Sequence, residues 1–135
     1  MLFTRETDYA LRILRHLDID ELRSISSIVQ QEYISLPIAY KVARKLEQGG
    51  LIRSVRGNSG GYQLKRDLSE ITLLDVYRIM NPDTAINECL REGHECPLNG
   101  TNGSDYCRMH KELARVQDSL YRELSSKSLA AILAE

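Results

Sequence analysis

Apolar residues recur with the spacing of a helix in the first third of the chain. In TRETDYALRILRHL the alanine, leucines and isoleucine share one face of a predicted helix, and Thr4 or Thr7 is placed to cap its N-terminus. The polar run DIDE then interrupts the pattern. A second, short helix is predicted from Ser24, its capping residue, to about Glu32. These two helices would form the first part of a small helical unit.

A third helix is predicted after the tight turn YIS. Ser35 is placed to cap it, and Pro37 lies in its first turn, where the missing N–H is not needed. Its apolar residues are predicted to form a buried stripe, Ile38, Ala39, Val42, Ala43 and Leu46, and a pair of glycines ends it. Two helices joined by a turn of three or four residues form a helix-turn-helix. On the third helix the residues between the core positions face outward and suit a DNA major groove: Tyr40, Lys41, Arg44 and Lys45.

The segment LIRSVRGNSGGYQLKR predicts two short strands joined by a tight turn, because four turn-forming residues lie in a row within it. A hairpin directly after the third helix is the wing of a winged helix, and it favours DNA binding over a helix pair that only packs. Arginine is favoured in a narrow minor groove, and the wing carries two arginines. The candidate DNA-binding set therefore adds Ser35 and Pro37 to the four helical residues, and from the wing Arg53, Arg56, Asn58, Ser59, Gly60 and Tyr62.

Two more helices are predicted in the second half of the chain. Thr72 begins the first, with Asp75 placed for a capping box, and an Asn-Pro pair ends it. The last, long helix is predicted to begin near Ser104 or Asp105, and the tail SLAAILAE to pack back as another turn or two. The apolar residues of the long helix form a stripe close to a heptad seam: Met109, Leu113, Val116, Leu120 and Leu124. Through this stripe the helix either folds back on the N-terminal core or, as we favour, pairs with a second chain.

These elements predict a mainly α (α+β) fold in a chain whose 135 residues suit one compact domain with an appendage. Residues 1–80 are expected to form a winged helix-turn-helix DNA-binding domain with a two-stranded wing. Residues 81–104 are expected to form a cysteine-bearing loop. Residues 105–135 are expected to form a dimerisation helix and its tail.

Composition and charge narrow the class of protein. No apolar run approaches the roughly 18 residues of a membrane span, and the charged start MLFTRETDYA does not fit a signal peptide. We therefore expect a cytoplasmic protein with no membrane contact. The net charge is −1, but residues 36–66 carry +6 and the remainder −7. A basic segment on an acidic body is typical of a site that meets phosphate, although a solvated charged face gives the same pattern.

The three cysteines, Cys89, Cys96 and Cys107, lie within the stretch CLREGHECPLNGTNGSDYCRMH. In a reducing compartment such a group indicates metal binding or reactivity sooner than a disulfide. Thiolates bind iron–sulfur clusters and zinc alike, so the residue type alone does not choose between them. A fourth ligand must come from elsewhere. An enzyme is not expected, because no acidic residue is placed to orient His110 beside a cysteine nucleophile.

Three stretches resemble the Rrf2 family of bacterial winged-helix regulators: TDYALRIL, ISLPIAYKVARKLEQGGLIRSVRGNSGGYQLKR and ITLLDVYRIM. The resemblance covers nearly the whole chain, and GLIRSVRG running into GGYQL is its most specific part. It implies a homodimer formed by the long helix, bound to double-stranded DNA at a palindromic promoter operator. For members with a cysteine cluster it also implies an iron–sulfur cluster that sets the DNA affinity.

On this resemblance the cluster ligands are the three cysteines and one further residue. His110, three residues after Cys107, resembles the pattern of IscR-like members. Asp8 matches the acidic residue that the partner subunit supplies in NsrR-like members, and we favour it slightly. The cysteines are spaced more widely here than in the family's cluster binders, which leaves a two-iron and a four-iron cluster both open.

The sequence thus predicts a dimeric transcriptional regulator, expected to be a repressor, whose cluster senses redox state, nitric oxide or iron supply. Loss of the cluster is expected to shift the two winged helices, so that half-sites about one helical turn apart no longer fit both. The alternative is a winged-helix regulator with a structural zinc, or with a thiol switch that needs no metal.

Overall fold

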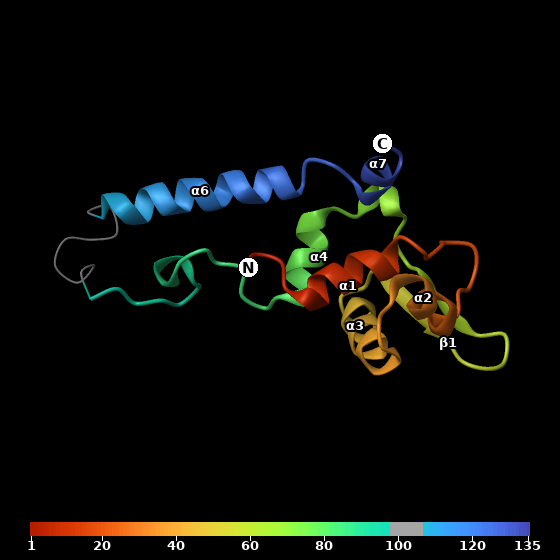
Figure 1. Ribbon diagram of the computed structural model, residues 1–135. Coiled ribbons are helices and arrows are strands. Elements are labelled where there is room, and N and C mark those ends of the chain that lie inside the picture. Colours follow the sequence, from red (N-terminus) through yellow and green to blue (C-terminus); the bar gives the residue numbers. More distant parts are fainter. Residues whose placement is uncertain (98–106) are drawn as a thin grey trace.

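The fold is described from a computed structural model that covers residues 1–97 and 107–135. Its elements, labelled in Figure 1 where there is room, are α1 (Arg5–Leu14), α2 (Ile25–Glu32), α3 (Leu36–Gln48), β1 (Ile52–Val55), β2 (Gly61–Leu64), η1 (Leu68–Glu70), α4 (Leu73–Met80), η2 (Glu88–Leu90), α6 (Arg108–Leu124) and α7 (Leu129–Leu133). The predicted mainly α fold with a two-stranded wing and a long C-terminal helix is confirmed. Within the described ranges no helix is long and apolar enough to cross a bilayer.

The helix starts follow the expected capping chemistry only in part. Thr4 caps α1, where its hydroxyl accepts the N–H of Thr7 at 3.2 Å. Thr72 and Asp75 form a complete capping box at α4. Ser24 and Ser35 occupy the predicted cap positions of α2 and α3, but neither side chain makes the cap hydrogen bond within the described chain. Packing, and not a side-chain cap, therefore fixes the start of α3.

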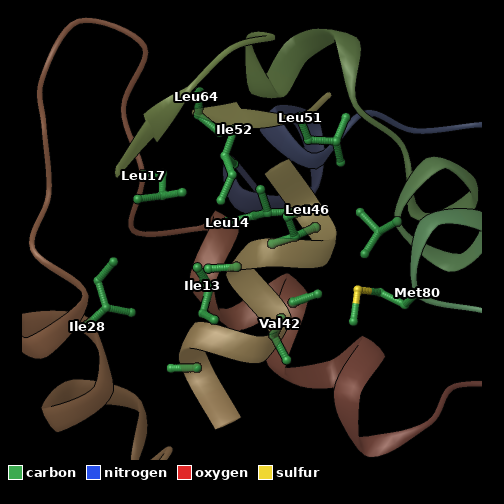
Figure 2. Packing of buried hydrophobic residues seen from close by; sticks show 14 of the residues in the cluster. Ile13, Leu14, Leu17, Ile28, Val42, Leu46, Leu51, Ile52, Leu64 and Met80 are labelled. Atoms are coloured by element: carbon green, nitrogen blue, oxygen red, sulfur yellow. The ribbon is translucent and has the colours of Figure 1, made fainter. Parts of the chain in front are cut away.

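The core is built around α3. Its buried face carries Ala39, Val42, Ala43 and Leu46, and Leu46 is fully buried. Figure 2 shows side chains from α1, α2, the wing and α4 gathered around this face. Because the four buried positions of α3 share one side of the helix, the opposite side must face solvent. The core thereby sets which residues of α3 a ligand can reach.

The wing is an antiparallel pair in which Ile52 lies opposite Leu64 and Val55 opposite Gly61. A second pair of backbone hydrogen bonds, both 2.8 Å, joins Arg23 to Tyr62 and fastens the wing to the segment before α2. Gly61 is required at this contact, because it has φ +153° and a Cβ there would lie 2.6 Å from the backbone oxygen of Arg23. The wing is therefore held at a fixed position beside α3.

A buried carboxylate, which the sequence did not indicate, joins α1 to α2. Glu32 is almost fully buried and accepts hydrogen bonds from Arg15 at 2.6 and 2.7 Å and from His16 at 2.6 Å. Burial works to raise the pKa of Glu32, but the hydrogen bonds from Arg15 and His16 outweigh it and hold that pKa below its usual value. The charged carboxylate helps to fix the angle between the first two helices.

Helix α6 lies away from the core of the domain, whereas α7 packs back on it. In Figure 1 α6 lies apart from α3, with α1 and α4 between them. The described helix begins at Arg108 with Cys107 as its N-cap, whereas the predicted start at Ser104 or Asp105 and the predicted boundary at 104/105 lie outside the described residues. The predicted packing of the tail is confirmed by α7, where the N–H of Leu129 donates to the oxygen of Ile71 at 2.7 Å and Leu129 is buried.

Candidate nucleic-acid interface and cysteine segment

The outward face of α3 carries the residues that the helical period placed there. Tyr40, Lys41 and Arg44 are exposed and Lys45 is half-buried. Ser35 and Pro37 are exposed at the N-terminal end of the helix. Such an arrangement exposes polar, aromatic and cationic groups from the first three turns of one helix. Their contact with DNA stays a prediction.

A cleft of about 590 Å³ separates α3 from the wing and the start of α2. Tyr40 and Arg44 line it from α3, and Arg56, Gly60 and Tyr62 line it from the wing. Burial, followed in effect by the nearby Glu47 carboxylate, raises the pKa of the Tyr62 phenol. The cleft therefore offers the neutral phenol of Tyr62, the side chain of Tyr40 and the guanidinium groups of Arg44 and Arg56 to a ligand.

The wing residues do not all join this cleft. Arg53 donates to the side-chain oxygen of Gln63 at 2.9 Å and is not among the residues that line the cleft. Asn58 and Ser59 are exposed at the tip of the hairpin, outside the cleft. The structure thus brings Arg56 together with Arg44 of α3 and places Arg53 elsewhere on the wing.

Two acidic residues that the sequence analysis did not identify, Glu6 and Glu47, form hydrogen bonds and ion pairs with this surface. Glu6 of α1 binds Lys41 at 2.6 Å and Lys45 at 2.5 Å. Hydrogen bonds from Lys41 and then Lys45 lower the pKa of Glu6, so its carboxylate stays charged at neutral pH. Glu47 accepts the hydroxyl of Ser54 at 2.8 Å and so ties α3 to β1. Part of the positive charge of α3 is therefore neutralised within the chain.

The cysteines lie on the segment that connects α4 to α6. The sulfur of Cys89, in η2, accepts from the amide of Asn87 at 3.1 Å. The sulfur of Cys107 accepts the backbone N–H of His110 at 3.4 Å and so caps α6. All three cysteines are half-buried and free. Within residues 1–97 and 107–135, no group of three candidate ligands is close enough to hold a metal ion.

Asp8 lies on α1, at the rim of an apolar groove of about 410 Å³ between α1, α4 and α7. Its carboxylate pairs with Arg12 at 2.9 Å, and its side chain is 49% exposed. No group in the described chain unites Asp8 with two of the cysteines. The role of Asp8 as a cluster ligand stays a prediction.

The beginning of the cysteine segment is fastened to both α1 and α6. The amide of Asn81 donates to the hydroxyl of the buried Thr7 at 3.1 Å. Tyr121 of α6 donates to the backbone oxygen of Thr84 at 2.9 Å, and Gln117 accepts the N–H of Ile86 at 2.9 Å. The segment thus connects the N-terminal turn of α1, which carries Glu6, to α6.

The donor set suits an iron–sulfur cluster by its chemistry. Three free thiols are available as thiolate ligands, and thiolates are the usual ligands of such clusters. Asp8 and His110 each add one oxygen or nitrogen donor. The same set suits zinc as Cys3His.

The comparisons with known proteins agree on one family. A model described as "Rrf2: Iron-dependent Transcriptional regulator" matches residues 3–135. Protein aau3 of Rhizobium meliloti is 30% identical over 132 residues, which cover 96% of this chain and 82% of that protein. CymR of B. subtilis, titled the global cysteine regulator, matches with a TM-score of 0.74 and 23% identity over 98% of this chain and 95% of its own. IscR of T. potens matches with a TM-score of 0.66 and 22% identity over 98% and 85%.

Proposed function

Since this chain belongs to the Rrf2 family of transcriptional regulators, we propose that it is a dimeric repressor that binds a palindromic operator and responds to an iron–sulfur cluster. Members of this family are regulators and not enzymes. This agrees with the sequence analysis, which expected no catalytic role for the cysteines. The observation that carries the DNA-binding proposal is the shared cationic face of α3 and the wing, on the side of the molecule away from α6 (Figure 1).

In the proposed complex α3 enters the major groove and the wing lies against the adjacent backbone or minor groove. Lys41, Arg44 and Lys45 provide the helical cations, and Arg53 and Arg56 those of the wing. The remaining proposed contacts are polar or backbone groups along the same surface: Ser35, Pro37, Tyr40, Asn58, Ser59, Gly60 and Tyr62. Phosphate contacts position the protein, while contacts to base edges give specificity.

The test removes two helical cations. The Lys41→Ala/Arg44→Ala variant should bind a mixed-sequence DNA duplex more weakly, and the slope of log affinity against log salt should fall by roughly 2, because about one counterion is released for each phosphate contact. Arg115→Ala/Arg122→Ala is the matched control, since it removes two cations from the face of α6 opposite the leucine stripe. Equal affinity of the first variant and the parent at one salt concentration would show that α3 does not bind DNA.

Glu6 is expected to oppose DNA binding, because it competes with phosphate for Lys41 and Lys45. Glu6→Gln should tighten DNA binding roughly 2- to 30-fold at low salt, since two partly exposed ion pairs of about 0.2–1 kcal/mol each no longer hold the lysines. Glu123→Gln, at the exposed end of α6, removes the same charge away from α3 and should leave the affinity unchanged. An affinity of Glu6→Gln equal to that of the parent would contradict this competition.

The proposed homodimer rests on α6. None of its 17 residues is buried by the rest of the described chain, although Leu113, Val116 and Leu120 form one stripe along it. An apolar stripe that its own chain leaves partly exposed is suited to pair with the same stripe of a second copy. The apolar groove beside Asp8 would then lie within reach of the partner, which supports Asp8 as a ligand supplied across the dimer.

The proposed cluster ligands are Cys89, Cys96 and Cys107, with Asp8 favoured over His110 as the fourth. When bound, such a cluster supplies a redox-sensitive group that oxidants or nitric oxide can attack. A carboxylate is a weaker ligand than a thiolate, which suits a sensor. A thiol switch without metal is the second candidate; a solved structure of S. aureus CymR in an oxidized form, 25% identical to this chain, supports it.

The contacts of the chain suggest how the cysteine segment acts on DNA affinity. Asn81 bonds Thr7, and the neighbouring Glu6 bonds the recognition helix through Lys41 and Lys45. A displacement of the cysteine segment would therefore move the first turn of α1 and alter the cations that α3 presents. Couplings of this kind are typically about 1–3 kcal/mol, or roughly 5- to 150-fold in affinity.

A further inference from the structure

Large apolar side chains are exposed together at the start of α3. Eleven large apolar residues are exposed in residues 1–97 and 107–135, and four of them fall between positions 33 and 40. Tyr33, in the turn before α3, is 93% exposed, and Leu36, Ile38 and Tyr40 are 41%, 39% and 45% exposed. Leu36 and Tyr40 are four positions apart and therefore share one side of α3, and we name this pair the apolar tip of α3. Ile38 lies on another side of the helix, and its exposure corrects the prediction that it belongs to the buried stripe. Single exposed apolar residues are ordinary, but a group of them indicates a binding surface.

The rest of the described fold does not cover the apolar tip. α3 buries its opposite face, which carries Val42 and Leu46, so the tip is not part of the core. α6, the proposed dimerisation helix, lies on another side of the molecule (Figure 1). A dimer formed through α6 would therefore leave the tip open to a different partner.

Cations surround the apolar tip. Lys41 and Arg44 are exposed on the following turn, and Arg56 lines the same cleft as Tyr40. The phosphates of DNA flank the base edges that are exposed in a groove. A surface with a small apolar group among cations is therefore complementary to such a groove. The residues at the N-terminal end of a recognition helix are those that reach the base edges. In the major groove the one apolar group on those edges is the C5 methyl of thymine.

We propose that the apolar tip of α3 reads thymine methyl groups in the major groove, so that each operator half-site carries thymine where Leu36 and Tyr40 meet the bases. This inference rests on the proposed DNA-binding function and adds its sequence preference. Pro37 supports it, because a residue without an N–H leaves the first turn with one fewer hydrogen-bond donor for the base edges.

The first step of the test is selection of duplexes from a random-sequence library by the full-length protein. The enriched operator should carry thymine at symmetric positions of both half-sites. Each of these thymines is then replaced by deoxyuridine, which removes the methyl group and keeps the base pairing. Fluorescence anisotropy at one salt concentration should show binding weakened roughly fourfold for each methyl removed, the value expected for one buried methyl group.

Single substitutions in the apolar tip test the proposed contact directly, because a purely structural role would not change the preference for thymine over deoxyuridine. Leu36→Ser and Tyr40→Ser should each bind the thymine and deoxyuridine duplexes with equal affinity at the position that the lost side chain contacted. Both side chains are exposed, so the variants should fold. Leu2→Ser, at an exposed apolar residue before α1, is the matched control and should keep the parent's preference for thymine.

The outcomes separate this inference from the proposed function. If the library yields no enriched sequence, sequence-specific DNA binding is wrong, and the reading of methyl groups is wrong with it. If an operator is found but deoxyuridine binds as well as thymine at every position, only the present inference is overturned. It is also overturned if both tip variants keep the full preference for thymine.

Discussion

Purified without oxygen, the Cys107→Ser variant should contain almost no iron or acid-labile sulfide and should lack the brown colour that the proposed cluster would give the parent protein. The reason is that serine provides no thiolate for an iron–sulfur cluster. Helix α6 should nevertheless stay intact. Cys107 is the N-cap of α6, where its sulfur accepts the N–H of His110, and serine is among the preferred residues at that position. The substitution therefore separates metal binding from folding.

The measurement is an absorption spectrum with iron and sulfide analysis, alongside circular dichroism of the metal-free proteins. Matching dichroism of variant and parent would show that α6 is retained. A variant that keeps the parent's iron and sulfide would exclude Cys107 as a ligand. A colourless parent that contains zinc, or no metal at all, would instead favour the zinc or thiol-switch alternative.

The fourth ligand can be identified in the same way. Asp8→Ala should lose cluster absorption, whereas Arg12→Ala, which removes only the ion-pair partner of Asp8, should keep it. Both side chains of this pair are partly exposed, so neither change should affect folding by more than about 1 kcal/mol. If Asp8→Ala keeps the cluster and His110→Ala loses it, His110 is the fourth ligand.

Local patterns predicted the elements of the fold because their causes are local. The period of Ala39, Val42 and Leu46 predicts α3 and its buried face, and the fold places all three in the core. The capping box at Thr72 follows from residues three positions apart. The run GNSGG predicts the turn between β1 and β2, because few residues other than glycine and asparagine fit such backbone angles.

The groups that shape the candidate site were missed because their causes are not local. Glu6 meets Lys41 and Lys45 across 35 and 39 positions of sequence, and Asn81 meets Thr7 across 74. No period or motif near Glu6 indicates these contacts. The assembled ligand set could not follow from the chain either, since the proposed place of Asp8 is on a second subunit.

Charge counted along the sequence also overstates what DNA would meet. Residues 36–66 carry a net +6, yet Glu6 lies outside this segment and pairs with two of its lysines. The cations of that segment without an ion pair to Glu6 include Arg44 and Arg56, which line the cleft between α3 and the wing. The affinity of this surface for DNA therefore depends on the ion pairs formed in the folded chain as well as on the number of charged residues.

The Leu113→Glu/Leu120→Glu variant should be a monomer and should bind the operator roughly 10²- to 10⁴-fold more weakly than the parent. Two linked half-sites gain this much from effective concentration, and the gain is lost when the subunits separate. Glutamates on both copies of the stripe would place like charges in an apolar contact, which opposes association. Neither leucine is buried within its own chain, so each subunit should still fold.

Light scattering after size-exclusion chromatography measures the mass, and anisotropy measures the affinity for an operator obtained by selection. Ser125→Glu/Ser126→Glu is the matched control, because it adds the same two charges at exposed positions just beyond α6. The control should remain a dimer with the affinity of the parent. A dimeric Leu113→Glu/Leu120→Glu variant would show that the subunits meet through a surface other than the stripe of α6. A monomer with undiminished affinity would show instead that one winged helix is enough for binding, and the proposed palindromic operator would be wrong.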